Sequence, residues 1–464
     1  MARKPCTPPV AAREPLRAVS LFSNCGAGDV GYAKAGFQFE VMAELDPRRM
    51  AVSLLNHPGA KGVVGDLRKT WKKVVEAYRL RAGTTRPALV AACPPCQGMS
   101  TARSGRGKEA DADAGSRDKR NLLVTVVSSV VKELKPDFVV LENVQAFLTK
   151  KIRHPRTRRP ISAAKFLVDE LGGDYEVFPV LLNLCDYGVP QTRKRTFLTF
   201  VHRASGFLKP LTDQKAAPYP RPSHAPDFKG KPVTLREALA KMRFPVLDAR
   251  DAKSATCSAY RGMHSVPIWT DHRYPMVAAI PPHLGGSAWQ NTSCARCGTV
   301  EVGADDAVCP ICSGPLTRPV VRKKDGTYRL VNGFRSSSYS RMKSDEPAAT
   351  ITTASGHVGS DHTIHPFQNR LLSTLECARL QTFPADFAWG DTLEKYGATN
   401  VRDMVGEAVP PLFTRKHGKV LVSLLRGEFN QAALPRNDQR VRRAEKKLGL
   451  KVEKEKKQKR TQLA

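Results

Sequence analysis

The stretch VSLFSNCGAGDVG, residues 19–31, decides which fold to expect for this chain. Its first four residues have the character of a buried strand, a glycine-bearing turn follows, and a helix is predicted over roughly residues 29–36. A strand that passes through such a turn into a helix is the opening unit of a sheet covered by helices on both faces. Ligands of these sheets bind at the carboxyl ends of the strands.

The same alternation continues to about residue 202. Further apolar runs of strand length occur at 39–43, 88–92, 138–141 and 196–201, and they are separated by helical stretches near 47–55, 68–81, 119–134 and 162–171. We therefore predict an α/β fold with a mostly parallel sheet. Helical patterning returns over residues 365–426.

Composition divides the chain into five parts. Residues 1–16 are predicted to be a flexible N-terminus without the apolar core of a signal peptide. Residues 17–202 form the α/β part, and 203–335 differ because they are rich in proline and hold a cysteine cluster. Residues 336–428 complete the α/β part. Residues 429–464 are expected to be a basic tail, either a solvated or frayed helix that touches phosphate or a plain solubilising segment.

Charge is the strongest bulk property of the chain. Its 464 residues carry a net charge of +32, and hydrophobic residues make up 41%, so a large core can form. Such an excess of lysine and arginine attracts polyphosphate, which favours nucleic acid as the partner over an acidic membrane surface. No apolar run of about 18 residues is present, so no membrane span is expected. Eleven cysteines without a secretory signal indicate a reducing compartment.

Cys96 is the first candidate for covalent chemistry. It follows the apolar run 88–92 on a turn made by Pro94 and Pro95, which fixes the local backbone. Basic residues in the next segment favour its thiolate form. Cys93 and Cys96 also form a CxxC, so a dithiol redox site or half of a metal site is an alternative. The nucleophile is favoured, because a Gly/Arg/Asp-rich loop follows and not the helix of a redox motif.

Three charged residues follow later strands. Glu142 ends the run 138–141, where a buried carboxyl can act as a general acid, although a capping or ion-pairing glutamate is common at such a place. Arg193 and Arg195 share one face of an extended segment and suit a phosphate or a base edge. A solvated basic strand edge is the alternative for the two arginines.

These fragments, in this order, resemble the cytosine-5 DNA methyltransferase family over residues 17–426, apart from the middle part. The resemblance is carried by the turn FSNCGAGDVG at 22–31, PPCQ at 94–97, ENV at 142–144, QTRKR at 191–195, RLQTFP at 379–384 and GEAVPP at 406–411. It implies a Rossmann-like methyltransferase sheet that binds S-adenosylmethionine. The cofactor-binding residues that it implies are Phe22, Ser23, Gly26, Glu44, Asp66, Pro94, Glu407 and Val409.

The resemblance also implies a mechanism on a cytosine flipped out of the duplex. The Cys96 thiolate adds to C6, Glu142 protonates or hydrogen-bonds N3, and Arg193 and Arg195 hold the base and its phosphate. The loop 97–117 closes over the base, and the last helix folds back to complete the cofactor pocket. Cys93 is expected to be dispensable for the chemistry.

Few residues depart from the family pattern. Asn24 and Ala27 replace usual glycines, Ala91-Ala92-Cys93 stands where glycines are common, and Glu407 replaces a usual asparagine. None of these changes touches the predicted nucleophile, acid or arginines, so we expect an active enzyme. The alternatives are C5 methylation of cytosine in RNA, a non-catalytic basic zinc protein that binds DNA, and a dithiol oxidoreductase.

Four cysteines in the middle part have the spacing of a zinc knuckle over residues 294–312: Cys294, Cys297, Cys309 and Cys312. Two disulfides are the alternative, which the reducing compartment disfavours. The family places its target-recognition domain here, so residues 203–335 are expected to read the DNA bases, stiffened by structural zinc.

The expected partner is double-stranded DNA, with no membrane. A cognate restriction endonuclease is a candidate second partner, because a restriction-modification role suits this enzyme class. We expect a monomeric, cytoplasmic, DNA-associated enzyme of bacterial or phage origin.

Overall fold

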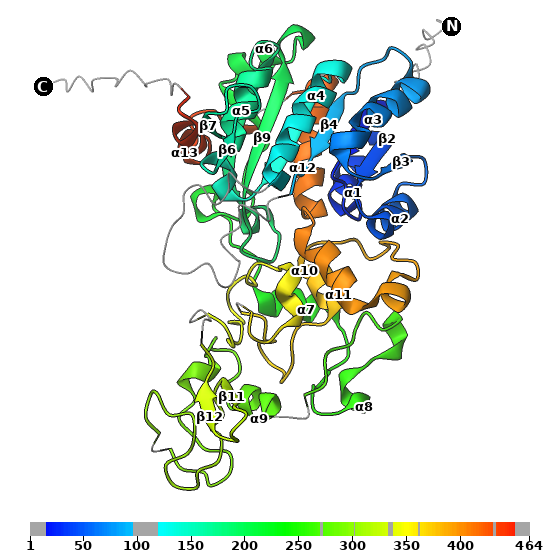
Figure 1. The fold of residues 1–464 in the computed structure, drawn as a ribbon. Coiled ribbons are helices and arrows are strands. Elements are labelled where there is room, and N and C mark those ends of the chain that lie inside the picture. The colour runs from blue at the N-terminus through cyan, green and yellow to red at the C-terminus, as the bar shows by residue number, and fades with distance from the viewer. Residues whose placement is uncertain are drawn as a thin grey trace, which may run out of the picture.

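The computed structural model describes residues 15–95, 119–269, 272–300, 302–332, 337–360, 362–429 and 433–450. Figure 1 shows two lobes: an upper one built on a sheet with helices on both faces, and a lower one that contains most of the middle part. Among the described residues, no helix has the length and apolar character needed to cross a bilayer.

A seven-stranded sheet in the order β3-β2-β1-β4-β5-β9-β8 forms the upper lobe. The first five strands in that order run parallel, and β9 and β8 are antiparallel to their neighbours. The strands are β1 (Leu16–Leu21), β2 (Phe37–Glu44), β3 (Lys61–Val64), β4 (Leu89–Ala92), β5 (Phe138–Asn143), β8 (Tyr175–Asn183) and β9 (Lys194–His202). The predicted α/β class with a central parallel sheet is confirmed, and β3 and β8 are the strands that the sequence did not predict.

Alternate residues of each strand point into two cores. Val19 and Leu21 of β1 belong to a core shared with α3 (Leu67–Ala82), α4 (Val124–Leu134) and α5 (Ala163–Leu171). Ala18 of the same strand belongs to the opposite core, with α1 (Ala27–Ala33), α2 (Pro47–Asn56) and α12 (Pro411–Leu425). Burial of both faces explains why these strands are nearly continuous apolar runs.

The late helix α12 packs directly on the early helix α1. An added Cβ at Gly31 would lie 1.9 Å from Thr414 Oγ1 and 2.3 Å from the Pro411 carbonyl oxygen, so only glycine allows this approach. The Thr414 hydroxyl donates a 2.7 Å hydrogen bond to the Gly28 carbonyl. The sequence predicted that the last helix folds back on the N-terminal part, and the α1–α12 contact is that fold-back.

The segment after residue 429 differs from the predicted basic tail. Strand β13 (Ala433–Pro435) pairs antiparallel with β10 (Ala216–Pro220), and α13 (Gln439–Leu448) packs beside β8. Val441 and Ala444 of α13 are fully buried, because apolar residues recur at helical spacing between the charges. The tail prediction is wrong for residues 433–448. The pairing also places residues 216–220 in the upper lobe and not in the middle part.

The remaining elements belong to both lobes. In the upper lobe they are the hairpin strands β6 (Lys151–Arg153) and β7 (Pro160–Ser162), and α6 (Leu208–Asp213). The lower lobe holds α7 (Leu235–Met242), α8 (Ala252–Ala255), α9 (Arg273–Ala278), β11 (Val320–Arg322), β12 (Tyr328–Leu330), α10 (Thr374–Leu380) and α11 (Thr392–Glu407).

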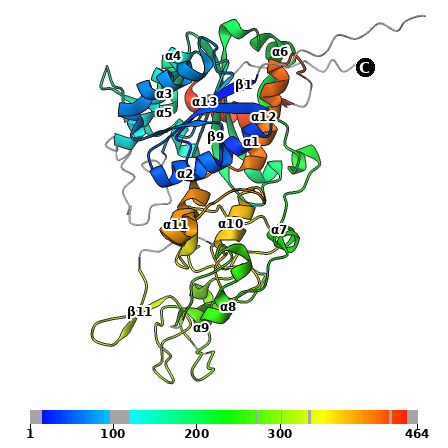
Figure 2. The ribbon, with the colours of Figure 1, turned by 90° about the vertical axis from the view of Figure 1, so that its right-hand side faces the viewer.

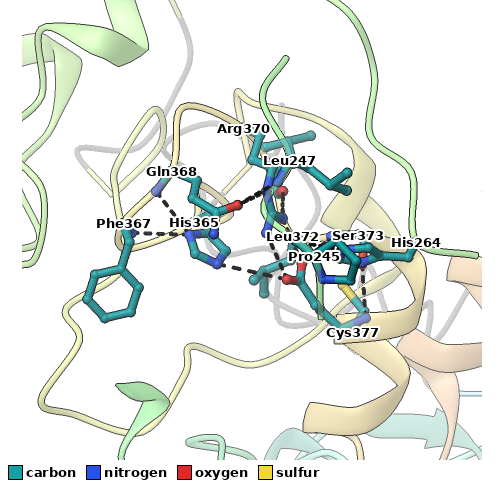
Figure 3. A network of polar contacts seen from close by, with 12 residues as sticks. Pro245, Leu247, His264, His365, Phe367, Gln368, Arg370, Leu372, Ser373 and Cys377 are labelled. Atoms are coloured by element: carbon teal, nitrogen blue, oxygen red, sulfur yellow. Dashed lines mark hydrogen bonds and ion pairs between the residues drawn. The ribbon is translucent and has the colours of Figure 1, made fainter. Parts of the chain in front are cut away.

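A buried polar network that includes an ion pair ties the middle part to α10, as Figure 3 shows in close-up. Arg370 makes two hydrogen bonds, of 2.7 and 2.8 Å, to Glu376, and both side chains are almost completely buried. Ser373 caps α10, and its hydroxyl lies 2.9 Å from Nδ1 of His264. The other His264 nitrogen lies 2.9 Å from the Pro245 carbonyl oxygen. This network fixes the start of α10 against residues 245–264.

Candidate active site

A cavity of about 520 Å³ opens at the carboxyl end of the parallel strands. Its walls come from the turn after β1, from the end of β4, from β5 and from the segment between α11 and α12. The described residues that line it include Phe22, Ser23, Asn24, Asp29, Cys93, Glu142, Phe197, Glu407 and Val409. The structure thus brings Glu142 together with four of the predicted cofactor residues, Phe22, Ser23, Glu407 and Val409.

The turn after β1 has a backbone that few side chains adopt. Phe22 and Asn24 have φ values of 59° and 50°, and Gly26 has 75°. An asparagine tolerates this region better than most residues, which explains how Asn24 replaces glycine. Its amide Nδ2 donates 2.9 Å to the Met404 carbonyl. A side chain at Gly26 would lie 2.7 Å from Ser53 Oγ, so this position requires glycine.

The two predicted cofactor carboxylates lie outside the described lining of this cavity. Glu44, at the end of β2, accepts hydrogen bonds of 2.8 Å from the backbone amides of Asn24 and Leu45, so it holds the turn in place. Asp66 caps α3 and binds Arg68 through its backbone amide and guanidinium, which lowers the pKa of the Asp66 carboxyl.

Glu142 is held at the cavity wall by two neighbours. The Cys93 thiol donates a 3.0 Å hydrogen bond to Oε2, and the Arg195 Nε lies 2.9 Å from Oε1 as an ion pair. Glu142 is only 6% exposed. The Arg195 contact lacks hydrogen-bond geometry, and no other described group donates to Oε1. One buried carboxylate oxygen therefore remains able to take a hydrogen bond from a bound molecule.

Arg193 points elsewhere. Its side chain is 1% exposed, and its guanidinium donates to the backbone carbonyls of Ile351, Gly406 and Ala408 at 2.9–3.0 Å. The prediction that Arg193 and Arg195 act together on a base and its phosphate does not agree with this geometry. Arg193 instead clamps the segments that form the C-terminal wall of the cavity.

Three further predicted residues have structural contacts. The carboxylate of Glu407, which stands where the family commonly has asparagine, forms an ion pair with Arg49 of α2. The Pro94 carbonyl accepts 3.0 Å from Nδ2 of Asn143, so the ENV segment fixes the backbone just before residue 96. Val409 lies against Gly28, because a Cβ added to Gly28 would be 3.2 Å from the Cβ of Val409.

Asp29 is a cavity residue that the sequence analysis missed. Burial raises the pKa of its carboxyl to about 7, although a 2.9 Å hydrogen bond from Ser20 Oγ opposes the shift. Its acidic side chain within a buried, glycine-rich turn is the feature that could have singled it out, since such a carboxyl needs a partner or a proton.

Of the remaining predicted site residues, the structure describes the four cysteines of the middle part but not Cys96. Cys96 and the loop 97–117 lie outside the described residues. The four cysteines of the middle part do come together, with all their sulfur atoms within 4.8 Å of one another.

The four sulfur atoms have the spacing of a metal site. Cys294 and Cys312 Sγ are 3.6 Å apart, and Cys297 and Cys309 Sγ are 3.5 Å apart. A zinc tetrahedron with Zn–S bonds of about 2.3 Å places sulfurs roughly 3.8 Å apart, whereas a disulfide needs about 2 Å. The backbone amide of Arg296 points at Cys294 Sγ, and that of Ile311 points at Cys309 Sγ, each at 3.4 Å.

Comparison with known proteins agrees with this site. The family model for C-5 cytosine-specific DNA methylases matches residues 16–423, so the chain belongs to this family. It is a DNA cytosine-5 methyltransferase, and its family uses S-adenosylmethionine.

Individual relatives span nearly the whole chain. The chain is 27% identical to the type II methyltransferase M1.HgaI of Avibacterium volantium, over 86% of this chain and 95% of that one. It is 28% identical to M.XorII of Xanthomonas oryzae pv. oryzae, over 88% and 85%. The solved structure of the Entamoeba histolytica methyltransferase EhMeth has the same fold, with a TM-score of 0.52 at 12% identity, over 89% of this chain and 99% of that one.

Proposed function

We propose that this enzyme methylates C5 of a flipped-out cytosine, with Cys96 as the nucleophile that adds to C6 and Glu142 as the group that binds N3. The observation that carries the proposal is the buried Oε1 of Glu142, which lines the cavity and accepts no hydrogen bond from a described group. Glu142 gives its proton to N3 as Cys96 adds to C6, and the resulting N3–H is the donor that Oε1 lacks. Addition at C6 makes C5 electron-rich, and release of the C5 proton and of Cys96 restores the aromatic ring.

The cavity fits S-adenosylmethionine. It combines an apolar wall, including Phe22 and Val409, with polar groups such as Ser23. When bound, the cofactor supplies the methyl group. Within the protein, Arg195 keeps Glu142 in place.

A covalent trap tests these roles. Duplex DNA with 5-fluorocytosine at the target position retains fluorine where the C5 proton must leave, so an active enzyme stays attached. We expect a stable complex with the wild-type protein, none with Cys96→Ser and a much slower one with Glu142→Gln. A Cys96→Ser variant that still transfers methyl groups at the wild-type rate would overturn the proposal.

We also propose that the cysteine cluster binds structural zinc and holds the target-recognition domain rigid. The sulfur spacing and the amides that point at Cys294 and Cys309 support a closed four-thiolate site. The domain has small apolar clusters of its own, such as the one around Leu316, so a metal would add much of its stability. One equivalent of zinc in the purified wild-type protein, and none in Cys294→Ser/Cys309→Ser, is expected. A metal-free wild-type protein with unchanged target choice contradicts this role.

The type II relatives support a restriction-modification context in the cytoplasm of a bacterial or phage-infected cell, with a cognate endonuclease as the second partner. We expect a monomer in solution, which light scattering can check.

A further inference from the structure

A basic β-ribbon projects from the lower lobe. Strands β11 and β12 pair only with each other, and Figure 2 shows β11 on a hairpin that extends away from the rest of the lobe. Residues 320–330 contain four basic residues and one acid: Arg322, Lys323, Lys324, Arg329 and Asp325. All four basic side chains are exposed, and none of them takes part in an ion pair with a described residue.

The two faces of the ribbon differ. The pairs Val320–Leu330, Val321–Arg329 and Arg322–Tyr328 are opposite each other, so residues alternate between faces along both strands. Val320 is 3% exposed and packs toward the lobe, whereas Val321 on the other face is 39% exposed. The outward face therefore presents Val321 and Arg329, with Lys323 beyond them near the turn.

The ribbon is held rigidly at both ends. At its base, the Arg318 guanidinium is buried and donates to several backbone carbonyls, including that of Asn291 at 2.7 Å. At its tip, Asp325 Oδ1 accepts from the amide and hydroxyl of Thr327 at 2.9 and 2.6 Å. An isolated two-stranded ribbon is marginally stable in water, so these anchors give a free-standing element one fixed shape.

We propose that the outward face of the β11–β12 ribbon enters the major groove of the DNA substrate, with Arg329 at a base edge and Lys323 and Lys324 at phosphates. The inference rests on the proposed target-recognition role of this domain and names the element that performs it. The major groove admits a two-stranded ribbon. An arginine in the middle of the inserted face suits bidentate contact with guanine, and the exposed Val321 beside it suits the thymine methyl group. The exposed lysines at the turn form no ion pair with a described residue, so their ammonium groups can reach phosphate.

The test separates base contact from phosphate contact. The recognition sequence is first obtained by bisulfite sequencing of DNA from a host that expresses the wild-type enzyme. Binding is then measured by fluorescence anisotropy over a range of salt concentrations, on a duplex with that sequence and on one of equal length without it. The variants are Arg329→Ala, Arg329→Lys and Lys323→Gln/Lys324→Gln. The matched control is Lys69→Gln/Lys73→Gln, which removes two exposed charges on α3 in the upper lobe.

Arg329→Ala should weaken binding to the target duplex about tenfold or more, weaken the other duplex much less, and relax the methylated sequence at one position. Arg329→Lys should restore overall affinity more than discrimination, because lysine lacks the bidentate fork. The double lysine variant should weaken both duplexes by similar factors and lower the salt slope by about one unit per lysine. Thermal melting should be unchanged, because the replaced side chains are exposed.

The proposal is overturned if Arg329→Ala and the double lysine variant both match the α3 control in affinity, salt slope and methylated sequence. Equal weakening of both duplexes by Arg329→Ala would also overturn its role at a base edge. A wild-type protein that binds DNA but leaves cytosine unmethylated would instead disprove the proposed reaction, so the two failures are distinguishable.

Discussion

The thiol of Cys93 donates a 3.0 Å hydrogen bond to Glu142, a carboxylate of the cavity wall that we propose binds the base. The sequence shows Cys93 only as the first half of a CxxC, three residues before the predicted nucleophile, and its loss was expected to leave the chemistry intact. The structure instead gives it a positioning contact with the acid. Arg195 holds the other oxygen of the same carboxylate, so the orientation of Glu142 depends on both neighbours.

Replacing Cys93 should therefore slow methyl transfer without abolishing it. A lost hydrogen bond to a charged group corresponds to about 1.5–3 kcal/mol, so Cys93→Ala should lower kcat by about tenfold or more. Cys93→Ser, whose hydroxyl can also donate, should recover most of the rate. Single-turnover methyl transfer checks this, with equal DNA affinity as the control. Equal rates for the alanine variant and the wild type would contradict the positioning role.

The two arginines of the QTRKR segment should give different phenotypes. Arg193→Lys removes most of the donors that bind three buried carbonyls, so it should destabilise the fold by about 3 kcal/mol and lower Tm. Arg195→Lys should keep the wild-type Tm and lower kcat, because its contact is with Glu142. Thermal melting and kcat, measured on the same preparations, test the pair. A Tm loss in Arg195→Lys with normal kcat would reverse the assignment.

Asp29 should make the free energy of unfolding depend on pH. Burial raises the pKa of this carboxyl from 3.8 to about 7. The stability that this shift contributes is fully present below about pH 4 and is lost as the pH rises through 7. Asp29→Asn cannot ionise. From pH 5 to pH 8 the wild type should lose about 2–3 kcal/mol relative to this variant, since one pKa unit is about 1.4 kcal/mol. The prediction is wrong if urea denaturation gives the same difference in unfolding free energy between the wild type and Asp29→Asn at both pH values.

The Arg370–Glu376 pair should matter to stability at neutral pH. Burial alone would raise the pKa of Glu376, but the Arg370 guanidinium lowers it to about 2. Glu376→Gln leaves a buried charge without its partner and should cost about 3–5 kcal/mol. The contribution of the wild-type pair is present above pH 4.5 and is lost as the pH falls toward 2, so the variant should lack this acid-sensitive part.

An exposed pair on α11 provides the matched control. Asp391→Asn breaks the contact with Lys395, where both side chains are more than half exposed, and should leave Tm unchanged. If Glu376→Gln melts at the same temperature as Asp391→Asn, the buried pair does not stabilise the start of α10.

Strand and helix order in the upper lobe was predictable from the chain, because strands buried on both faces are continuous apolar runs. Strand β3 escaped prediction since only Val63 of its four residues is buried, which leaves no apolar run. Helix α13 escaped for the opposite reason. Its many arginines and lysines hide the few apolar positions, among them Val441 and Ala444, that turn toward the sheet.

The site was predictable as a set of residues but not as a set of contacts. The ion pair of Glu142 with Arg195 was not predicted, and Arg193 was misplaced because alternate residues share a face only within a regular strand. Arg193 precedes β9, which begins at Lys194, so the strand rule does not reach it. The role of Cys93 depends on a contact across the two strands β4 and β5, and a local pattern carries no information about such a neighbour.

The pairing of β13 with β10, and the packing of α13 beside β8, have a consequence for how the protein is made. A ribosome that has completed the strands of the large sheet has not yet supplied the segment that covers one edge of it, and the α12 wall of the cavity also arrives late. Domains fold as units during synthesis, so the nascent upper lobe has to wait until residues 433–448 have been made. The enzyme is therefore expected to gain activity only once this segment has been synthesised, and a translation product interrupted before it should be unable to modify the host DNA.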